Sequence, residues 1–71
     1  MSPIERAIFK AGGVTFLAKS IGEKNYQTIQ NWVRSGSVPP NKVILIEKAT
    51  GIPRYELSPD LYPPEEYKKA S

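Results

Sequence analysis

The chain has 71 residues, a formal net charge of +3, and neither cysteine nor histidine. A chain of this size forms one small domain with a thin core. Without cysteine or histidine it lacks disulfides, thiolate zinc sites and Ser-His or Cys-His nucleophile pairs, so we expect no enzyme, no metal site and no cofactor.

The first residues predict a helix over residues 3–11. Ser2 can cap its start, Pro3 suits the first helical position, and Glu5 completes a capping box. Apolar residues then recur at helical spacing. They are Ile4, Ala7, Ile8 and Ala11, with Phe9 beside them. A pair of glycines ends this helix.

Two further short helices, joined by a turn, are predicted over residues 14–21 and 26–34. Gly22 can adopt the left-handed conformation that ends the first of them. Asn25 can cap the second, and the small side chain of Ala18 lets the two helices cross closely. The pattern predicts a helix-turn-helix.

The second half of the chain predicts a fourth helix and a short fifth one. Pro40 suits a first helical position and Gly51 a helix end, so we expect a helix between them. The run Val43–Ile46 could instead form a strand, because β-branched residues favour strands. The flanking proline and glycine favour the helix, and residues 52–57 suggest one further helical turn.

The C-terminal residues are rich in proline. Residues 58–64 are expected to be extended, with Leu61 and Tyr62 packed back on the core. Residues 1–63 then form the helix-turn-helix domain, and residues 64–71 form a polar, frayed tail. Together these elements predict an all-α fold, a compact bundle of about five short helices.

The helix predicted over residues 26–34 has two chemically different sides. At about 100° per residue, Ile29, Trp32 and Val33 lie together, so we expect Trp32 to anchor the core. The opposite side carries three amides and one guanidinium, those of Gln27, Gln30, Asn31 and Arg34. Tyr26 lies on a flank, where it could touch a thymine methyl group or a phosphate, or simply cover the turn.

The polar side of this helix has the side chains that contact base edges in the DNA major groove. Gln and Asn present a donor and an acceptor together to adenine, and Arg presents two donors to guanine. The Glu and Lys pairs typical of a solvated helix are absent, although an ordinary polar surface is the alternative. The base-reading candidates are Tyr26, Gln27, Gln30, Asn31 and Arg34.

The excess positive charge lies in the half of the chain that holds the helix pair. Residues 1–37 contain five Lys or Arg against two Glu, whereas residues 38–71 contain five residues of each sign. Attraction to phosphates predicts this asymmetry, and chance is the alternative. The phosphate-contact candidates are Thr15, Lys19, Lys24 and Asn25, with Arg6 or Lys10 as further contacts.

No segment suits a membrane. The longest apolar run, Val43–Ile46, has four residues, whereas a spanning helix needs about 20. The first residues lack the basic and apolar regions of a signal peptide. We therefore expect a cytoplasmic protein.

Several blocks of the sequence, taken in order, resemble a known family. The blocks are Thr15–Gly22, Ile29–Trp32, Val38–Pro40, Ile46–Gly51 and Tyr55–Pro63. They resemble Cro-type phage repressors, and especially the YdaS-like group of Cro-related prophage proteins. The resemblance implies a lambda-repressor-like DNA-binding domain. It also implies a sequence-specific transcriptional repressor that binds operator DNA as a dimer through the major groove.

The resemblance assigns roles to individual positions. Ala18 and Gly22 match the family's small residue and turn glycine, and Ile29 and Trp32 match its buried positions. The family's base-facing residues begin at positions that correspond to Asn25, Tyr26, Gln27 and Gln30. The turn here is one residue longer than the family's, which leaves open where the following helix begins.

The expected partners are double-stranded operator DNA and a second copy of the chain, with the dimer surface in residues 38–63. No membrane and no small-molecule substrate are expected. A prophage transcriptional activator would use the same contacts. An antitoxin-like or other protein-interaction module is an alternative of a different class, and its binding to a protein would be insensitive to salt.

Overall fold

The computed structural model describes residues 1–68, and helices are the only regular secondary structure over that range. Its six helices are α1 (Pro3–Ala11), α2 (Val14–Ile21), α3 (Tyr26–Ser35), α4 (Pro40–Thr50), α5 (Arg54–Leu57) and α6 (Pro64–Lys68). The all-α prediction is therefore confirmed. The run Val43–Ile46, which could have been a strand, lies inside α4.

The predicted capping residues set the helix ends. At the start of α1, the Ser2 backbone N–H donates to Glu5 Oε1 at 2.9 Å, and the Glu5 N–H donates to Ser2 Oγ at 3.3 Å. The hydrogen bond from the Ser2 backbone is the main cause that lowers the pKa of Glu5, with the Ser2 hydroxyl adding to it. Gly22 and Gly51 end α2 and α4 in the left-handed conformation, at φ values of 72° and 80°.

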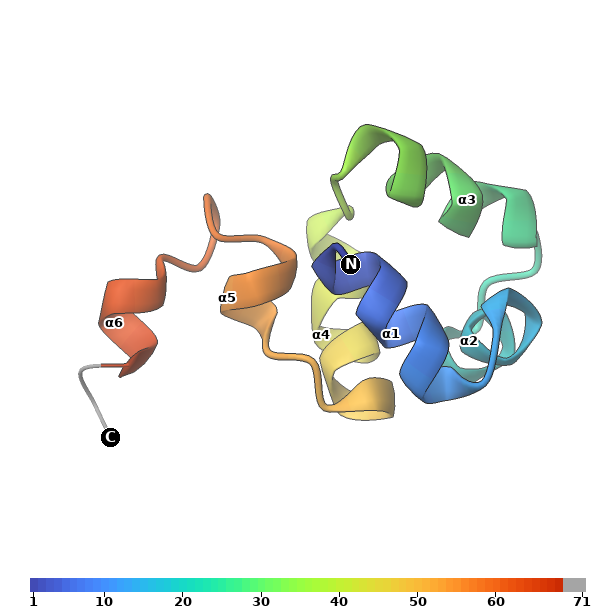
Figure 1. The fold of residues 1–71 in the computed structure, drawn as a ribbon, viewed down its shortest axis with the longest axis horizontal. Coiled ribbons are helices and arrows are strands. Elements are labelled where there is room, and N and C mark those ends of the chain that lie inside the picture. Colours follow the sequence, from blue (N-terminus) through green and yellow to red (C-terminus); the bar gives the residue numbers. More distant parts are fainter. Residues whose placement is uncertain (69–71) are drawn as a thin grey trace.

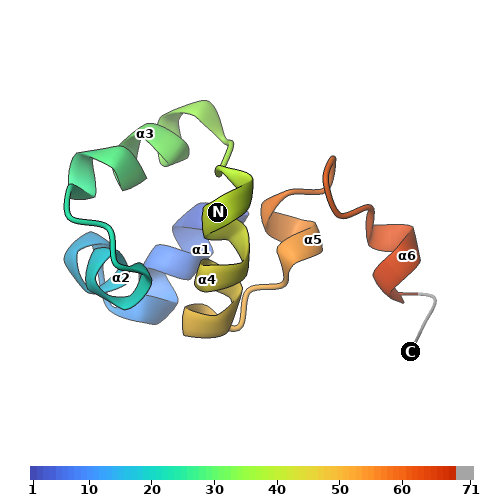
Figure 2. The same ribbon diagram turned by 180° about the vertical axis from the view of Figure 1, so that it is seen from behind.

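The core lies where α1, α2 and α4 meet, and α3 crosses one side of this group (Figures 1 and 2). Leu17, Ile29, Val43 and Ile46 are its largest fully buried side chains. They come from α2, α3 and α4, so each of these helices contributes one apolar face to a shared interior. Val38 and Ile52, in the segments that flank α4, are also buried.

Two ion pairs attach α5 to the bundle. Arg6 of α1 pairs with Glu56. Arg54 donates to Glu47 of α4 twice, from its backbone N–H at 3.0 Å and from Nε at 2.9 Å. Burial raises the pKa of Glu47, but the hydrogen bonds and charge of Arg54 outweigh that effect and leave the pKa lowered.

Replacing Glu47 with glutamine is expected to reduce the free energy of unfolding by about 1 kcal/mol at neutral pH, because the pair is partly solvated. Because the pKa of Glu47 is lowered in the folded state, its ionised carboxylate stabilises the fold at pH values above 4.5, the ordinary glutamate pKa. This stabilisation is lost as the pH falls through the lowered pKa. Urea titrations of both proteins between neutral and acidic pH measure the difference. Glu66→Gln, which neutralises an exposed carboxylate on α6, is the control. If the difference in the free energy of unfolding between wild type and Glu47→Gln did not change with pH, the stabilising role of the ionised Glu47 carboxylate would be contradicted.

The C-terminal residues differ from the prediction in two respects. Leu61 is 48% exposed rather than packed on the core. A turn places Tyr62 inward instead, with its N–H donating to Ser58 O at 2.9 Å and its ring 5.6 Å from the Arg54 guanidinium carbon. Residues 64–68 form α6 where a frayed tail was expected, because Pro64 begins a helix and two glutamates occupy its first turn. Residues 69–71 of that tail lie outside the described residues.

Candidate nucleic-acid interface

The turn between α2 and α3 is fixed by backbone and side-chain hydrogen bonds. Gly22 ends α2, and the N–H of Glu23 donates to Ala18 O at 2.8 Å. Asn25 caps α3, since its Oδ1 accepts from the Gln27 N–H at 3.0 Å. The longer turn therefore spans Gly22–Asn25, and α3 begins at Tyr26. This settles the helix start that the sequence left open.

Three apolar residues hold α3 against the bundle. Ile29 is fully buried, Trp32 is 6% exposed, and Val33 packs half-buried against the core. The prediction that Trp32 anchors the core is confirmed. Ala18 on α2 is also buried, and its small side chain lets α3 pack closely. With one side fixed, the opposite side of α3 must face outward.

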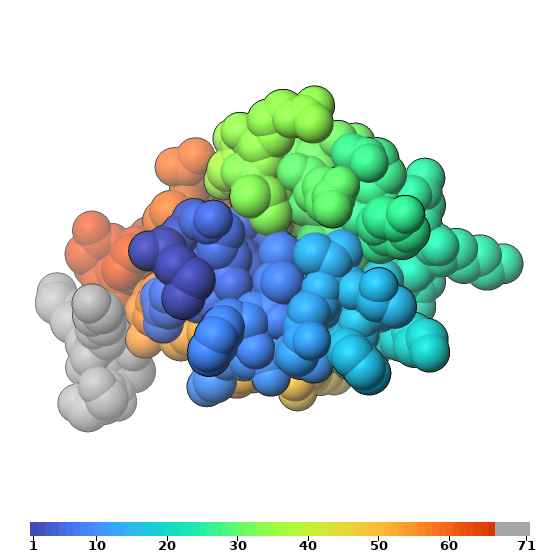
Figure 3. Space-filling view, turned by 45° about the vertical axis from the view of Figure 1, so that its right-hand side comes forward, coloured from blue at the N-terminus to red at the C-terminus, as the bar shows by residue number. Residues whose placement is uncertain are grey.

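The outward side of α3 carries what we call the α3 ridge, which consists of Gln27, Gln30, Asn31 and Arg34. All four residues are exposed. Gln27 Nε2 donates to Asn31 Oδ1 at 3.4 Å, so two of the three amides are linked one helical turn apart. No acidic residue lies between Tyr26 and Ser35. In the space-filling view, α3 forms one edge of the molecule above α1 and α2 (Figure 3).

Tyr26 and the phosphate-contact candidates border the α3 ridge. Tyr26 is 56% exposed. Thr15, Lys19 and Lys24 are exposed as well. The side-chain oxygen of Asn25 is occupied as the cap, which leaves its Nδ2 group as the donor for an external acceptor.

Arg6 and Lys10 each lie beside a residue that is distant in the sequence. Arg6 pairs with Glu56, and the Lys10 ammonium lies beside Gly51 at the C-terminal end of α4. A cation is favoured there by the helix dipole. Both contacts join residues distant in sequence, so the local pattern gave no sign of them.

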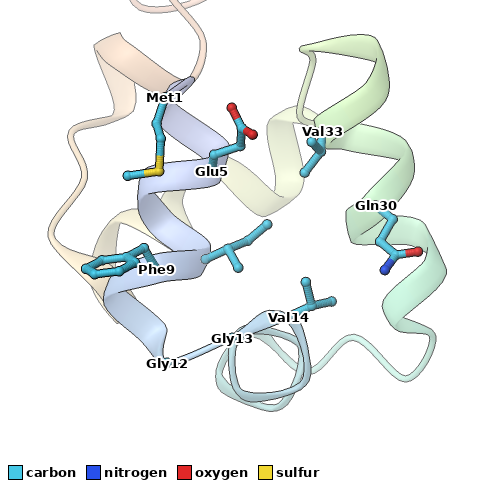
Figure 4. Close-up of a pocket in the computed structure, with 9 residues that line it drawn as sticks. Met1, Glu5, Phe9, Gly12, Gly13, Val14, Gln30 and Val33 are labelled. Carbon is cyan, nitrogen blue, oxygen red and sulfur yellow. The ribbon is translucent and has the colours of Figure 1, made fainter.

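An apolar groove adjoins the α3 ridge and was missed by the sequence analysis. It has a volume of about 640 Å³ and is lined by residues of α1, the start of α2 and α3. Glu5 and Phe9 line it from α1, and Val33 and Gln30 line it from α3 (Figure 4). Gln30 thus belongs to both surfaces. Phe9 is 75% exposed. In the sequence it lay beside the apolar side of its predicted helix, and that position was the one sign of the groove.

In the described part of the chain, no group of His, Cys, Asp or Glu residues could hold a metal ion. Among residues 1–68, no helix combines the length and apolarity needed to cross a membrane.

Comparison with known proteins gave one match. The model of a family described as bacterial toxin YdaS matches residues 4–66. No curated protein and no solved structure matches the chain.

Proposed function

The chain belongs to the family described as bacterial toxin YdaS, and from this premise we propose that it is a sequence-specific DNA-binding regulator. The observation that carries the proposal is the α3 ridge, whose amides and guanidinium project from a helix held by Ile29 and Trp32. These groups match the donors and acceptors of base edges in the major groove. We further propose that the regulator is a Cro-type repressor without catalytic activity, acting on DNA in the cytoplasm.

The proposed DNA contacts fall into two sets. The α3 ridge and Tyr26 contact base edges, while Thr15, Lys19, Lys24 and Asn25 contact phosphates on either side. The exposure of all these residues and the absence of acidic residues from α3 support the assignment, since a carboxylate there would repel the DNA backbone.

Replacing Lys24 with alanine is expected to weaken binding to every duplex alike, because a phosphate contact carries no sequence information. The logarithm of the binding constant falls linearly with the logarithm of the salt concentration, and the magnitude of this slope should decrease by about one. Fluorescence anisotropy at several salt concentrations measures it. Lys48→Ala, which removes the same charge from an exposed position in the last turn of α4, should leave the slope unchanged. Equal slopes for wild type and Lys24→Ala would show that Lys24 does not contact a phosphate.

Replacing Gln27 with alanine is expected to lower discrimination at one base pair by about 1–3 kcal/mol, while non-specific binding stays nearly intact. Competition between a selected duplex and its single-base variants measures the change. Asn41→Ala, which removes an exposed amide from α4, is the matched control. An equal loss on all sequences would contradict a base-contacting role for Gln27.

We propose that the regulator binds DNA as a dimer, because one α3 offers few contacts and two half-sites about one helical turn apart would multiply the affinity. The proposed contact between copies lies within residues 38–63 and leaves out the exposed side chains of Asn41 and Lys48. An activator would use the same α3 ridge. The position of the binding site relative to a promoter, mapped by footprinting, distinguishes it from a repressor.

A second candidate function is an antitoxin-like or other protein-interaction module. The apolar groove favours it, since Met1 and Phe9 at its edge are 80% and 75% exposed, and exposed apolar clusters commonly mark binding surfaces. Binding of this kind would persist at high salt and would be lost on Phe9→Asp, which places a charge on an exposed residue of the groove. DNA binding would be lost at high salt.

A further inference from the structure

The hydrogen bond between Gln27 and Asn31 determines which groups the two amides offer to a ligand. Gln27 Nε2 donates to Asn31 Oδ1 at 3.4 Å, and both side chains are exposed. The bond orients each amide, because a carboxamide has one donating and one accepting end. Gln27 is left with its free carbonyl oxygen and Asn31 with its free NH₂ group. Side by side, the linked pair presents one acceptor and one donor.

Adenine is the base whose major-groove edge complements this pair. Its N6 amino group donates and its N7 accepts. Gln27 Oε1 can accept from N6 while Asn31 Nδ2 donates to N7. Guanine offers two acceptors, O6 and N7, so the Gln27 carbonyl oxygen would face an acceptor and lose its partner.

Arg34 lies further along the same side of α3. It follows Gln27 by seven residues, so at about 100° per residue the two point in nearly the same direction. A rise of about 1.5 Å per residue separates Arg34 from Asn31 by roughly 4.5 Å and from Gln27 by roughly 10.5 Å along the helix. Adjacent base pairs are about 3.4 Å apart, so this separation corresponds to roughly one to three base pairs. A guanidinium directed at a base edge prefers guanine O6 and N7.

We propose that the α3 ridge selects a half-site containing adenine and, about one to three base pairs away, guanine. The linked Gln27 and Asn31 recognise the adenine as one unit, and Arg34 recognises the guanine. This inference rests on the proposed DNA-binding function and gives it a specific ligand.

The test is selection of bound duplexes from a random pool by the full chain. The variants are Gln27→Ala, Asn31→Ala, the double variant and Arg34→Ala, with Asn41→Ala as control. Wild type and the control should enrich adenine and guanine at the stated spacing. Each single amide variant should lose roughly 5- to 100-fold discrimination for adenine and keep guanine. The double variant should lose no more than either single variant, because the pair acts as one unit. Arg34→Ala should lose guanine alone.

A duplex carrying 7-deazaadenine tests the proposed hydrogen bond from Asn31 Nδ2 directly, because this base lacks the N7 acceptor. It should bind wild type more weakly than the adenine duplex, and it should bind Asn31→Ala equally well. Independent effects of Gln27 and Asn31 at two different base pairs, or an enriched motif without the adenine and guanine, would overturn the inference while leaving DNA binding intact. If no duplex binds even at low salt, the proposed function fails, and this inference fails with it.

Discussion

Replacing Trp32 with alanine is expected to remove a large share of the free energy of unfolding. Trp32 is 6% exposed and holds α3 on the bundle, and truncating a buried aromatic costs about 3–5 kcal/mol. A domain of 71 residues has a total stability of only about 4–10 kcal/mol. Urea unfolding followed by far-ultraviolet circular dichroism measures the loss.

Phe9→Ala is the matched control for this prediction. It removes another aromatic ring, but one that is 75% exposed, so the free energy of unfolding should change by less than about 1 kcal/mol. If Trp32→Ala were as stable as Phe9→Ala, α3 would not depend on its buried face. The rigid platform required for the α3 ridge would then be absent.

Replacing Asn31 with aspartate is expected to abolish DNA binding without unfolding the protein. The substitution is nearly isosteric, and a carboxylate oxygen can still accept the hydrogen bond from Gln27 Nε2. The added negative charge would face the electronegative bases and phosphates. Like charges juxtaposed in an interface cost several kcal/mol, so a penalty of about 3 kcal/mol would weaken binding more than a hundredfold.

Asn41→Asp controls for the change in net charge. Asn41 is exposed in the first turn of α4, and both variants lower the net charge by one. Anisotropy titrations at low salt should show a large loss for Asn31→Asp and a small loss for Asn41→Asp. Equal losses would mean that total charge, rather than the α3 ridge, governs binding.

The helix boundaries could be predicted from sequence because local chemistry sets them. Ser2 and Asn25 cap the helices that follow them, and Gly22 and Gly51 end helices in the left-handed conformation. These effects act over a few residues, so they are visible in the sequence. The outward direction of the α3 ridge follows in the same way from the buried spacing of Ile29 and Trp32.

The features that the sequence analysis missed depend on contacts between distant residues. Arg6 is a typical surface cation in the sequence, but the fold brings it to Glu56, 50 positions later. Leu61 appeared suited to the core, but the turn at Ser58–Tyr62 selects Tyr62 for the inward position. The groove requires three helices to be placed together, and no single segment encodes it.

The family description and the proposed function are compatible in physical terms. A small protein that occupies a promoter can stop growth by blocking transcription, so toxicity needs no catalytic centre.

The most direct test of the account is a titration of isotope-labelled protein with duplex DNA at low salt, followed by the side-chain amide signals in nitrogen–proton spectra. Gln27, Gln30 and Asn31 each give such signals, and Asn41 on α4 provides an internal reference. The account predicts that the three signals from the α3 ridge shift with added DNA while that of Asn41 does not. Unchanged signals from the α3 ridge under saturating DNA, or shifts confined to the backbone amide signals of groove residues such as Phe9, would contradict it.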